Sequence, residues 1–169
     1  MPTATGRLLF VLVILAHERR RVVHLAVTDH PTAAWTAQQL REAFPLDDAP
    51  CYLLHDRDTA FHAWATTATA IGIEEVVAAV RSPWQNAYAE RLIGSMLRRE
   101  CLDHVIIGNA RGLRCVLRAY VKYYLRTRAH LSLGKDAPVS RPVALPTDGA
   151  IVAIPHLGGL HHRYERRAA

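Results

Sequence analysis

Hydrophobic residues near the start of the chain form two runs separated by a charged turn. Residues 8–16 are continuously apolar, and residues 22–28 are rich in β-branched side chains. Two such runs joined by a short polar segment are typical of a β-hairpin. The first run lacks alternation, which predicts a strand buried on both faces. The apolar core of a signal peptide is the alternative, but charged residues 17–21 follow without a small-residue cleavage pattern, which favours the strand.

The pattern then changes to helices that alternate with strands, as in α/β domains. Apolar residues at helical spacing predict a helix that begins after Thr32, its expected N-cap, and ends at Pro45. The later elements are expected in the order strand, helix, strand, helix, helix, over residues 51–56, 60–71, 74–80, 86–103 and 110–128. We expect one domain over residues 1–146 and a Gly- and His-rich tail over 147–169.

Composition limits the classes to which the protein can belong. The chain has 169 residues, of which 50% are hydrophobic, and this excludes disorder as its main state. Three scattered cysteines are too few for a disulfide scaffold, and no apolar run is long enough to span a membrane. These features predict a cytoplasmic protein with no membrane partner.

Positive charge is concentrated in the middle of the chain. The formal charge of +6 divides into −3 over residues 1–80, +7 over 81–130 and +2 over 131–169. Nineteen of the 21 basic residues are arginines, whose planar forks suit phosphate oxygens. Basic side chains also recur every fourth residue on the last predicted helix, at Arg114, Arg118, Lys122 and Arg126. Nucleic acid is the partner that this clustering favours, and a solvated helix face is the alternative.

Two carboxylates stand at positions that suit metal chemistry. Asp56 follows a predicted strand, and Glu90 lies in the first turns of the helix that follows the turn at residues 82–85. Carboxylates from separate elements can share a hard divalent cation. Both positions are also common for reasons of helix capping and dipole interaction, so the pair alone leaves the choice open.

The local sequences around these carboxylates resemble a known family. Leu-Leu-His-Asp-Arg-Asp at residues 53–58 and Arg-Ser-Pro-Trp-Gln-Asn-Ala-Tyr-Ala-Glu-Arg-Leu at residues 81–92 resemble the catalytic core of insertion-sequence transposases and retroviral integrases. Residues 98–104, the Tyr-Tyr pair with Arg-Ala-His at 128–130, and Arg-Pro at 141–142 are also similar to bacterial members. The resemblance extends over about residues 7–142.

The resemblance implies a ribonuclease H-like fold, a mixed sheet flanked by helices. It also implies an Asp, Asp, Glu triad that binds two Mg²⁺ or Mn²⁺ ions for phosphodiester cleavage and strand transfer. In this mapping Asp56 is the second Asp of the triad and Glu90 its Glu, while Asp58 is a neighbour outside the metal site. Thirty-three residues separate Asp56 from Glu90, slightly fewer than is usual in the family.

The chain departs from the family pattern at its start. The first Asp of the triad precedes the run that matches residues 8–16, on the central strand of the family's sheet, and this sequence begins after that point. We therefore expect a site with two of three ligands that holds metal weakly and is inactive as written. The neighbours of that strand are expected either to pair with each other or to leave backbone groups unpaired.

DNA contacts are expected from the turn before Glu90 and the helix after it. Trp84 is expected to stack on a base or ribose, or else to pack under the turn. Asn86 is expected to cap the helix and to bond a phosphate, and positive charge comes from Arg91, Arg98 and Arg99.

Two functions stay open at this point. The first is a transposase or integrase core that acts on DNA in recombination. The second is a catalytically inactive remnant that binds DNA or associates with an intact transposase. Whether the chain is an enzyme is left undecided, and a homo-oligomer is what the family implies. A ribonuclease H-like nuclease outside mobile elements is a third, weaker reading.

Overall fold

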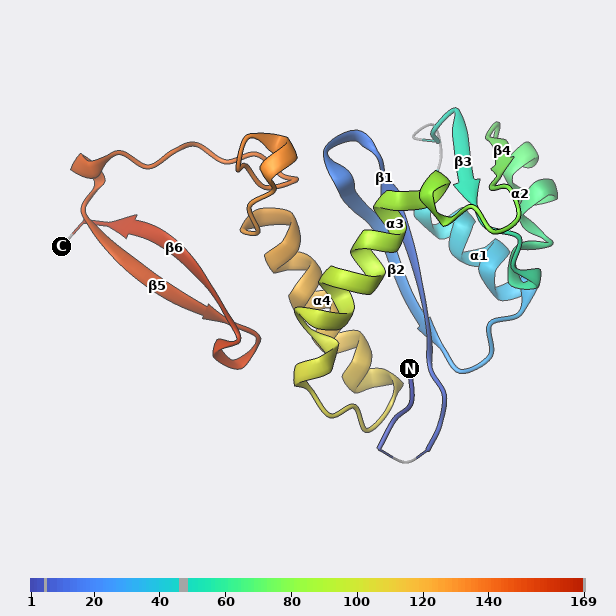
Figure 1. The fold of residues 1–169 in the computed structure, drawn as a ribbon, viewed down its shortest axis with the longest axis horizontal. Helices are drawn as coiled ribbons and strands as arrows, with labels where there is room; N and C mark the ends of the chain where they lie inside the picture. Colours follow the sequence, from blue (N-terminus) through green and yellow to red (C-terminus); the bar gives the residue numbers. More distant parts are fainter. Residues whose placement is uncertain (5, 46–48, 169) are drawn as a thin grey trace.

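The computed structural model describes residues 1–4, 6–45 and 49–168 and shows a mixed α/β fold (Figure 1). A long antiparallel hairpin of β1 (Phe10–Ala16) and β2 (Arg21–Thr28) lies at its centre, with Phe10 opposite Thr28 and Ala16 opposite Arg21. A 3₁₀ turn over Glu18–Arg20 joins the strands. Both predicted strands and their pairing as a hairpin are confirmed.

The hairpin is covered on both faces, as the unbroken apolar run predicts. Leu12 and Ile14 pack with α1 (Ala33–Ala43) and α2 (Trp64–Ala70) on one face. The residues between them turn to the other face, where α4 (Ala110–Arg126) supplies buried Leu113, Leu117 and two tyrosines. Figure 1 shows α1 and α4 on opposite sides of β1 and β2. The expected mixed α/β architecture of layers is therefore present.

A parallel strand pair carries the first candidate carboxylate. β3 (Tyr52–His55) pairs in parallel with β4 (Glu74–Val77), and α2 lies in the connection between them. Parallel strands require a crossover of this kind, because a tight turn cannot reverse the chain twice. The preceding helix α1 begins as predicted, with the Thr32 hydroxyl accepting a hydrogen bond from the backbone N–H of Trp35 at 3.2 Å.

The helix expected over 86–103 differs from its prediction. The chain passes from a 3₁₀ turn (Pro83–Asn86) into α3 (Ala87–Arg91) and then into a π-helical segment (Leu92–Arg99). The Asn86 side chain makes no capping hydrogen bond. Its backbone, at φ −115° and ψ 37°, lacks the extended conformation from which a cap side chain folds back on the first N–H groups. The predicted cap is therefore wrong.

The strands of the described residues do not join into one sheet. β1 pairs with β2, β3 with β4, and no ladder joins these two pairs within residues 1–4, 6–45 and 49–168. No helix in the described part of the chain is both long and apolar enough to cross a bilayer.

The expected tail forms a second hairpin. β5 (Ala150–His156) pairs with β6 (His161–Arg167) in antiparallel register, and this hairpin projects from the side of α4 (Figure 1). His161 attaches it, because its ring stacks on Tyr123 with centroids 4.5 Å apart. The β-branched run at 151–154 followed by Gly158 and Gly159 is the signal for a hairpin that the sequence carried.

Candidate functional site

Asp56 lies directly after β3 and is adjacent in sequence to a buried, hydrogen-bonded residue. Its Oδ1 accepts a hydrogen bond from the backbone N–H of Asp58 at 3.1 Å, and its side chain is exposed. The residue before it, His55, is buried, and His55 Nε2 lies 2.7 Å from Glu75 Oε1. Phe61 and Trp64 pack against the His55 ring. The carboxylate of Asp56 is thus presented to solvent from a rigid base.

Asp58 has a separate, structural role. Its side chain caps the short 3₁₀ helix Thr59–Phe61 by accepting a hydrogen bond from the backbone N–H of Ala60 at 2.8 Å. This contact agrees with its expected place outside the metal site.

Glu90 is positioned by α3, which is anchored on the hairpin turn. Tyr88 of α3 lies between His17, whose ring centroid is 5.1 Å away, and Arg20, whose guanidinium carbon is 4.8 Å from the Tyr88 ring centre. Glu90 itself is exposed. The turn before α3 is tied to the end of the parallel pair, since Gln85 Oε1 accepts a hydrogen bond from Ala79 N–H at 2.7 Å. Sequence reasoning missed this role of Gln85.

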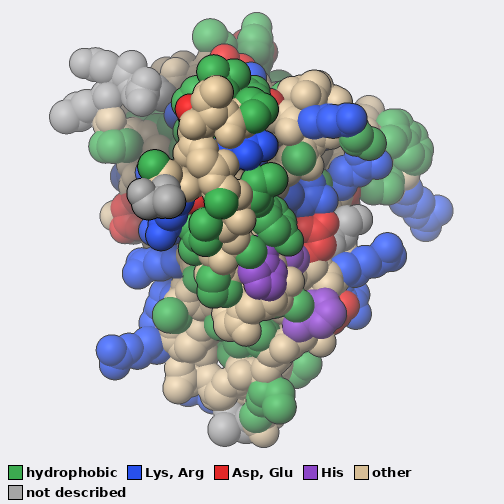
Figure 2. All heavy atoms as spheres, turned by 90° about the vertical axis from the view of Figure 1, so that its left-hand side faces the viewer, with side chains coloured by type: hydrophobic (Ala, Val, Ile, Leu, Met, Phe, Trp, Pro, Cys, Tyr) green, Lys and Arg blue, Asp and Glu red, His purple; other side chains and the backbone are tan. Residues whose placement is uncertain are grey.

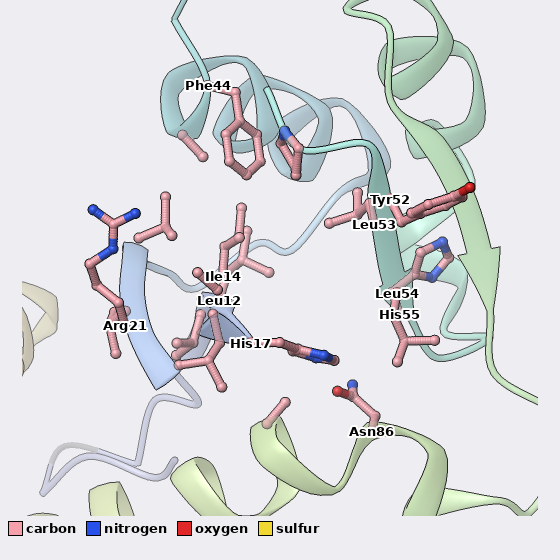
Figure 3. Close-up of a pocket in the computed structure, with 18 of the residues that line it drawn as sticks. Leu12, Ile14, His17, Arg21, Phe44, Tyr52, Leu53, Leu54, His55 and Asn86 are labelled. Carbon is pink, nitrogen blue, oxygen red and sulfur yellow. The ribbon is translucent and has the colours of Figure 1, made fainter. Parts of the chain in front are cut away.

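The structure brings Asp56 and Glu90 to one cavity of about 740 Å³, which we call the interstrand cavity. It lies between β1 and β3 and is closed on one side by the start of α3. Figure 3 shows Leu12 and Ile14 of the hairpin across from Leu53 and Leu54 of β3. His17 and Asn86 point into the space between them (Figure 3), so the amide of Asn86 faces the cavity.

The donors at this cavity match a hard divalent cation in type but fall short in number. Carboxylate and amide oxygens are the ligands that Mg²⁺ and Mn²⁺ prefer. Within the described residues, however, no three His, Cys, Asp or Glu side chains converge closely enough to hold a metal ion. Asp56 and Glu90 alone are an incomplete ligand set.

The expected DNA-binding residues occupy exposed positions around α3. Trp84 is 70% exposed, so it does not pack under the turn. Arg99 is exposed, and Arg98 makes only a long contact to Asp103, with Nε and Oδ1 3.8 Å apart. Surface pairs of this kind hold a side chain weakly. These side chains remain available to a ligand.

The basic face of α4 divides into structural and free positions. Arg114 donates a hydrogen bond to the Val27 carbonyl at 3.2 Å and so fixes α4 to the hairpin. Arg118, Lys122 and Arg126 are exposed. Figure 2, which views the molecule from the side of the β5–β6 hairpin, shows Lys and Arg side chains projecting at both edges of the molecule.

Sequence reasoning missed a half-buried network that joins α4 and the chain after it to Glu100, which follows the π-helical segment. Arg128 Nε and Nη2 donate to the two carboxylate oxygens of Glu100 at 2.7 and 2.5 Å, and the Tyr120 hydroxyl donates to Glu100 at 2.9 Å. Burial favours a raised pKa for Glu100, but the hydrogen bonds from Arg128 and Tyr120 outweigh it and lower that pKa. We call these three residues the Glu100 network.

Three comparisons show which known proteins this chain is similar to. Residues 71–138 match the model of the integrase core domain family. The chain is 28% identical over 178 residues to "Insertion element IS476 uncharacterized 39.2 kDa protein" of Xanthomonas euvesicatoria, over 95% of this chain and 50% of that protein. A chain of the simian T-cell lymphotropic virus intasome, solved in complex with PP2A regulatory subunit B56 gamma, superposes with a TM-score of 0.57. It is 15% identical, over 91% of this chain and 59% of that chain.

The matches indicate one kind of fold, although this chain is shorter than the proteins it matches. It spans about half the length of the curated relative it matches. The family match includes Glu90 and the segment 81–92 on which the sequence resemblance most depends. The structural likeness extends the same fold to nearly the whole chain. Residues 71–138 are thus similar to the integrase core domain family, and the chain as a whole has a ribonuclease H-like mixed α/β fold.

Proposed function

We propose that the protein acts on DNA in integration or transposition, with Asp56 and Glu90 as two of the carboxylates of a divalent-metal site. One observation carries this proposal: these two side chains come from separate elements and line the same cavity. The bound metal ions would activate an attacking oxygen and stabilise the leaving oxygen of a DNA phosphodiester. The described residues contribute the rigid placement of the two carboxylates, and a third carboxylate must join them for cleavage.

DNA is the proposed substrate because exposed basic residues and an exposed tryptophan lie on the segments before and after α3. Arg98, Arg99 and exposed Trp84 lie on the elements that flank Glu90. Cationic side chains hold the phosphate backbone, and an exposed aromatic ring stacks on bases. A second copy of the chain or an intact transposase is the proposed protein partner.

The test is Mn²⁺-dependent cleavage and joining of duplex oligonucleotides, together with Mn²⁺ binding followed by electron paramagnetic resonance. Asp56→Asn and Glu90→Gln are expected to weaken Mn²⁺ binding and to abolish any cleavage that the wild type shows. Asp58→Asn is the matched control, because an asparagine oxygen can still cap Ala60. If both site variants cleaved DNA and bound Mn²⁺ like the wild type, the assignment would be wrong.

The alternative function is DNA binding without cleavage. The observation that favours it is that no third His, Cys, Asp or Glu joins the pair within the described residues. It predicts DNA binding that weakens steeply with salt, and no strand cleavage with Mg²⁺ or Mn²⁺. Under this alternative, Asp56→Asn leaves DNA affinity unchanged or slightly raised, since a negative charge is removed.

A further inference from the structure

A second cavity borders the end of α3 at Arg91. Its volume is about 330 Å³, and it shares no lining residue with the interstrand cavity. Its walls come from the hairpin turn, the end of α3, the π-helical segment and the chain after α4. We call it the arginine cavity, and its lining residues are Arg20, Arg91, Met96, Arg128, Ala129, His130, Leu131 and Ser132.

The charge in the arginine cavity is unbalanced. Three guanidinium groups line it, and no Asp or Glu does. Arg128 is paired with Glu100, whereas Arg20 and Arg91 have no acidic partner within the described residues. Arg20 is held instead against the face of Tyr88. Cations brought together without counter-ions repel each other, so an anion that enters the cavity relieves that repulsion.

His130 supplies a second, independent sign of a missing ligand. Its side chain lines the cavity and is 3% exposed. Its Nε2 is buried and has no hydrogen-bond partner within the described residues. Buried polar atoms without partners are rare, and each calls for an explanation such as an absent ion. Burial, together with the charges of Arg128 and Arg20, lowers the pKa of His130 to about 4.

We propose that the arginine cavity is a phosphate-binding site in which Arg20, Arg91 and His130 hold the phosphate oxygens. Arginine forks match tetrahedral oxyanions with paired N–H donors. The Nε2 of His130 gains a hydrogen-bond partner when the anion binds. Ser132, at the exposed rim, adds a hydroxyl donor.

The phosphate group can belong to free inorganic phosphate or to a DNA backbone. The site itself stands without the chemistry assigned to Asp56 and Glu90, and only its assignment to DNA rests on the proposed function. Glu90 and Arg91 are consecutive residues of α3 that line different cavities. A DNA phosphate held by Arg91 therefore places the strand across α3, next to the interstrand cavity.

The experiment is calorimetric titration of the whole chain with inorganic phosphate at pH 7 and low ionic strength. Arg91→Gln is the variant of choice, because Arg91 is exposed and makes no ion pair within the described residues. Its loss is expected to weaken phosphate binding by about tenfold or more, as the loss of a charge-assisted hydrogen bond would. Arg111→Gln removes the same charge from an exposed position on α4 and is expected to change the affinity by less than about twofold.

An NMR titration distinguishes specific phosphate binding in the arginine cavity from non-specific electrostatic attraction to the protein surface. A bound anion favours the protonated imidazole, so phosphate is expected to raise the pKa of His130 in an NMR titration. Glu100, Arg128 and Arg20 are the charged groups that act on this ring. Absence of phosphate binding, equal weakening by Arg91→Gln and Arg111→Gln, or an unmoved His130 titration would each overturn the proposal.

The source of the phosphate is decided by a competition arm. Duplex DNA binding is measured with and without inorganic phosphate, for the wild type and for Arg91→Gln. Competition together with weaker DNA binding by the variant assigns the site to the DNA backbone. Phosphate binding that leaves DNA affinity unaffected in both proteins assigns it to the free anion. Neither result depends on metal-dependent cleavage, so the phosphate site and the proposed function fail separately.

Discussion

The interstrand cavity and the Glu100 network place the same chemical group in opposite conditions. Asp56 and Glu90 are exposed, and Glu90 has no hydrogen-bond or ion-pair partner within the described residues. Both oxygens of Glu100 are hydrogen bonded to Arg128, and Tyr120 donates a further bond. A carboxylate whose oxygens are all satisfied by the protein stabilises the fold, whereas a rigidly placed carboxylate with free oxygens is available to a ligand. The difference separates a carboxylate that serves the fold from two carboxylates that are open to a ligand.

Side chains are packed more tightly around α4 than around the interstrand cavity. A matched pair of leucine substitutions tests this difference in packing. Leu117 of α4 is fully buried, while Leu53 of β3 is 8% exposed and borders the interstrand cavity. Leu117→Ala is expected to lower the free energy of unfolding by about 3–5 kcal/mol, because a closed void remains. Leu53→Ala is expected to lower the free energy of unfolding by about half as much, because the Leu53 side chain already borders open space on one side. Urea denaturation measures both, and equal losses would contradict the contrast in packing.

The next largest effect is expected where a satisfied carboxylate loses its charge. Glu100→Gln is expected to lower the free energy of unfolding by about 2–3 kcal/mol, because Arg128 is left half-buried without its bidentate partner. Asp103→Asn is the control, since Asp103 and Arg98 are exposed and form only the long surface pair. That control is expected to cost less than about 0.5 kcal/mol. Comparable losses in urea would show that the Glu100 network is not a stabilising element.

The sequence predicts the elements of this fold better than it predicts their assembly. The apolar run at 8–16 and the spacing around Leu117 identified β1 and α4, because periodicity reports directly which faces are buried. The separation of β1 from β3 follows from pairing between distant segments, which no local pattern encodes. Asn86 was mistaken for a cap because residue type is only one requirement, and the backbone conformation set by Pro83–Asn86 is the other.

Prediction of the candidate site shows the same division. Asp56 and Glu90 can be predicted as candidates because each motif lies on a single segment, and both residues line one cavity. The arginine cavity was not found, because Arg20, Arg91 and His130 come from three distant segments. Its residues are ordinary within their local sequences. Only the tertiary arrangement gathers them around one space.

The pH dependence of the free energy of unfolding is expected to come mainly from buried His130. Burial, with help from the positive charges of Arg128 and Arg20, lowers the pKa of His130 to about 4 from the ordinary histidine value of 6.5. Between these values the unfolded chain binds a proton that the folded ring does not, so stability is lost as the pH falls from 6.5 towards 4. Glu100, with its lowered pKa, adds a further loss as the pH falls through the range where unfolded glutamates titrate and below it.

Between pH 7 and pH 5 this loss is expected to be about 1–2 kcal/mol. Urea denaturation at the two pH values measures it, and His62→Gln serves as a control because His62 is exposed. His130→Gln is expected to flatten the dependence between these two pH values. A profile that is identical in the wild type and in His130→Gln would assign the effect to other groups.

The smallest effect on stability is expected at the two exposed candidate carboxylates, Asp56 and Glu90. Asp56→Asn and Glu90→Gln are each expected to change the free energy of unfolding by less than about 0.5 kcal/mol, because both side chains are exposed. Neither substitution removes an ion pair within the described residues, and an asparagine oxygen at position 56 can still accept the Asp58 N–H. A large loss of stability from either variant would move that carboxylate into the structural class to which Glu100 belongs. An unchanged urea midpoint, combined with weakened Mn²⁺ binding, would instead show that the protein keeps these two acids for a ligand and not for its fold.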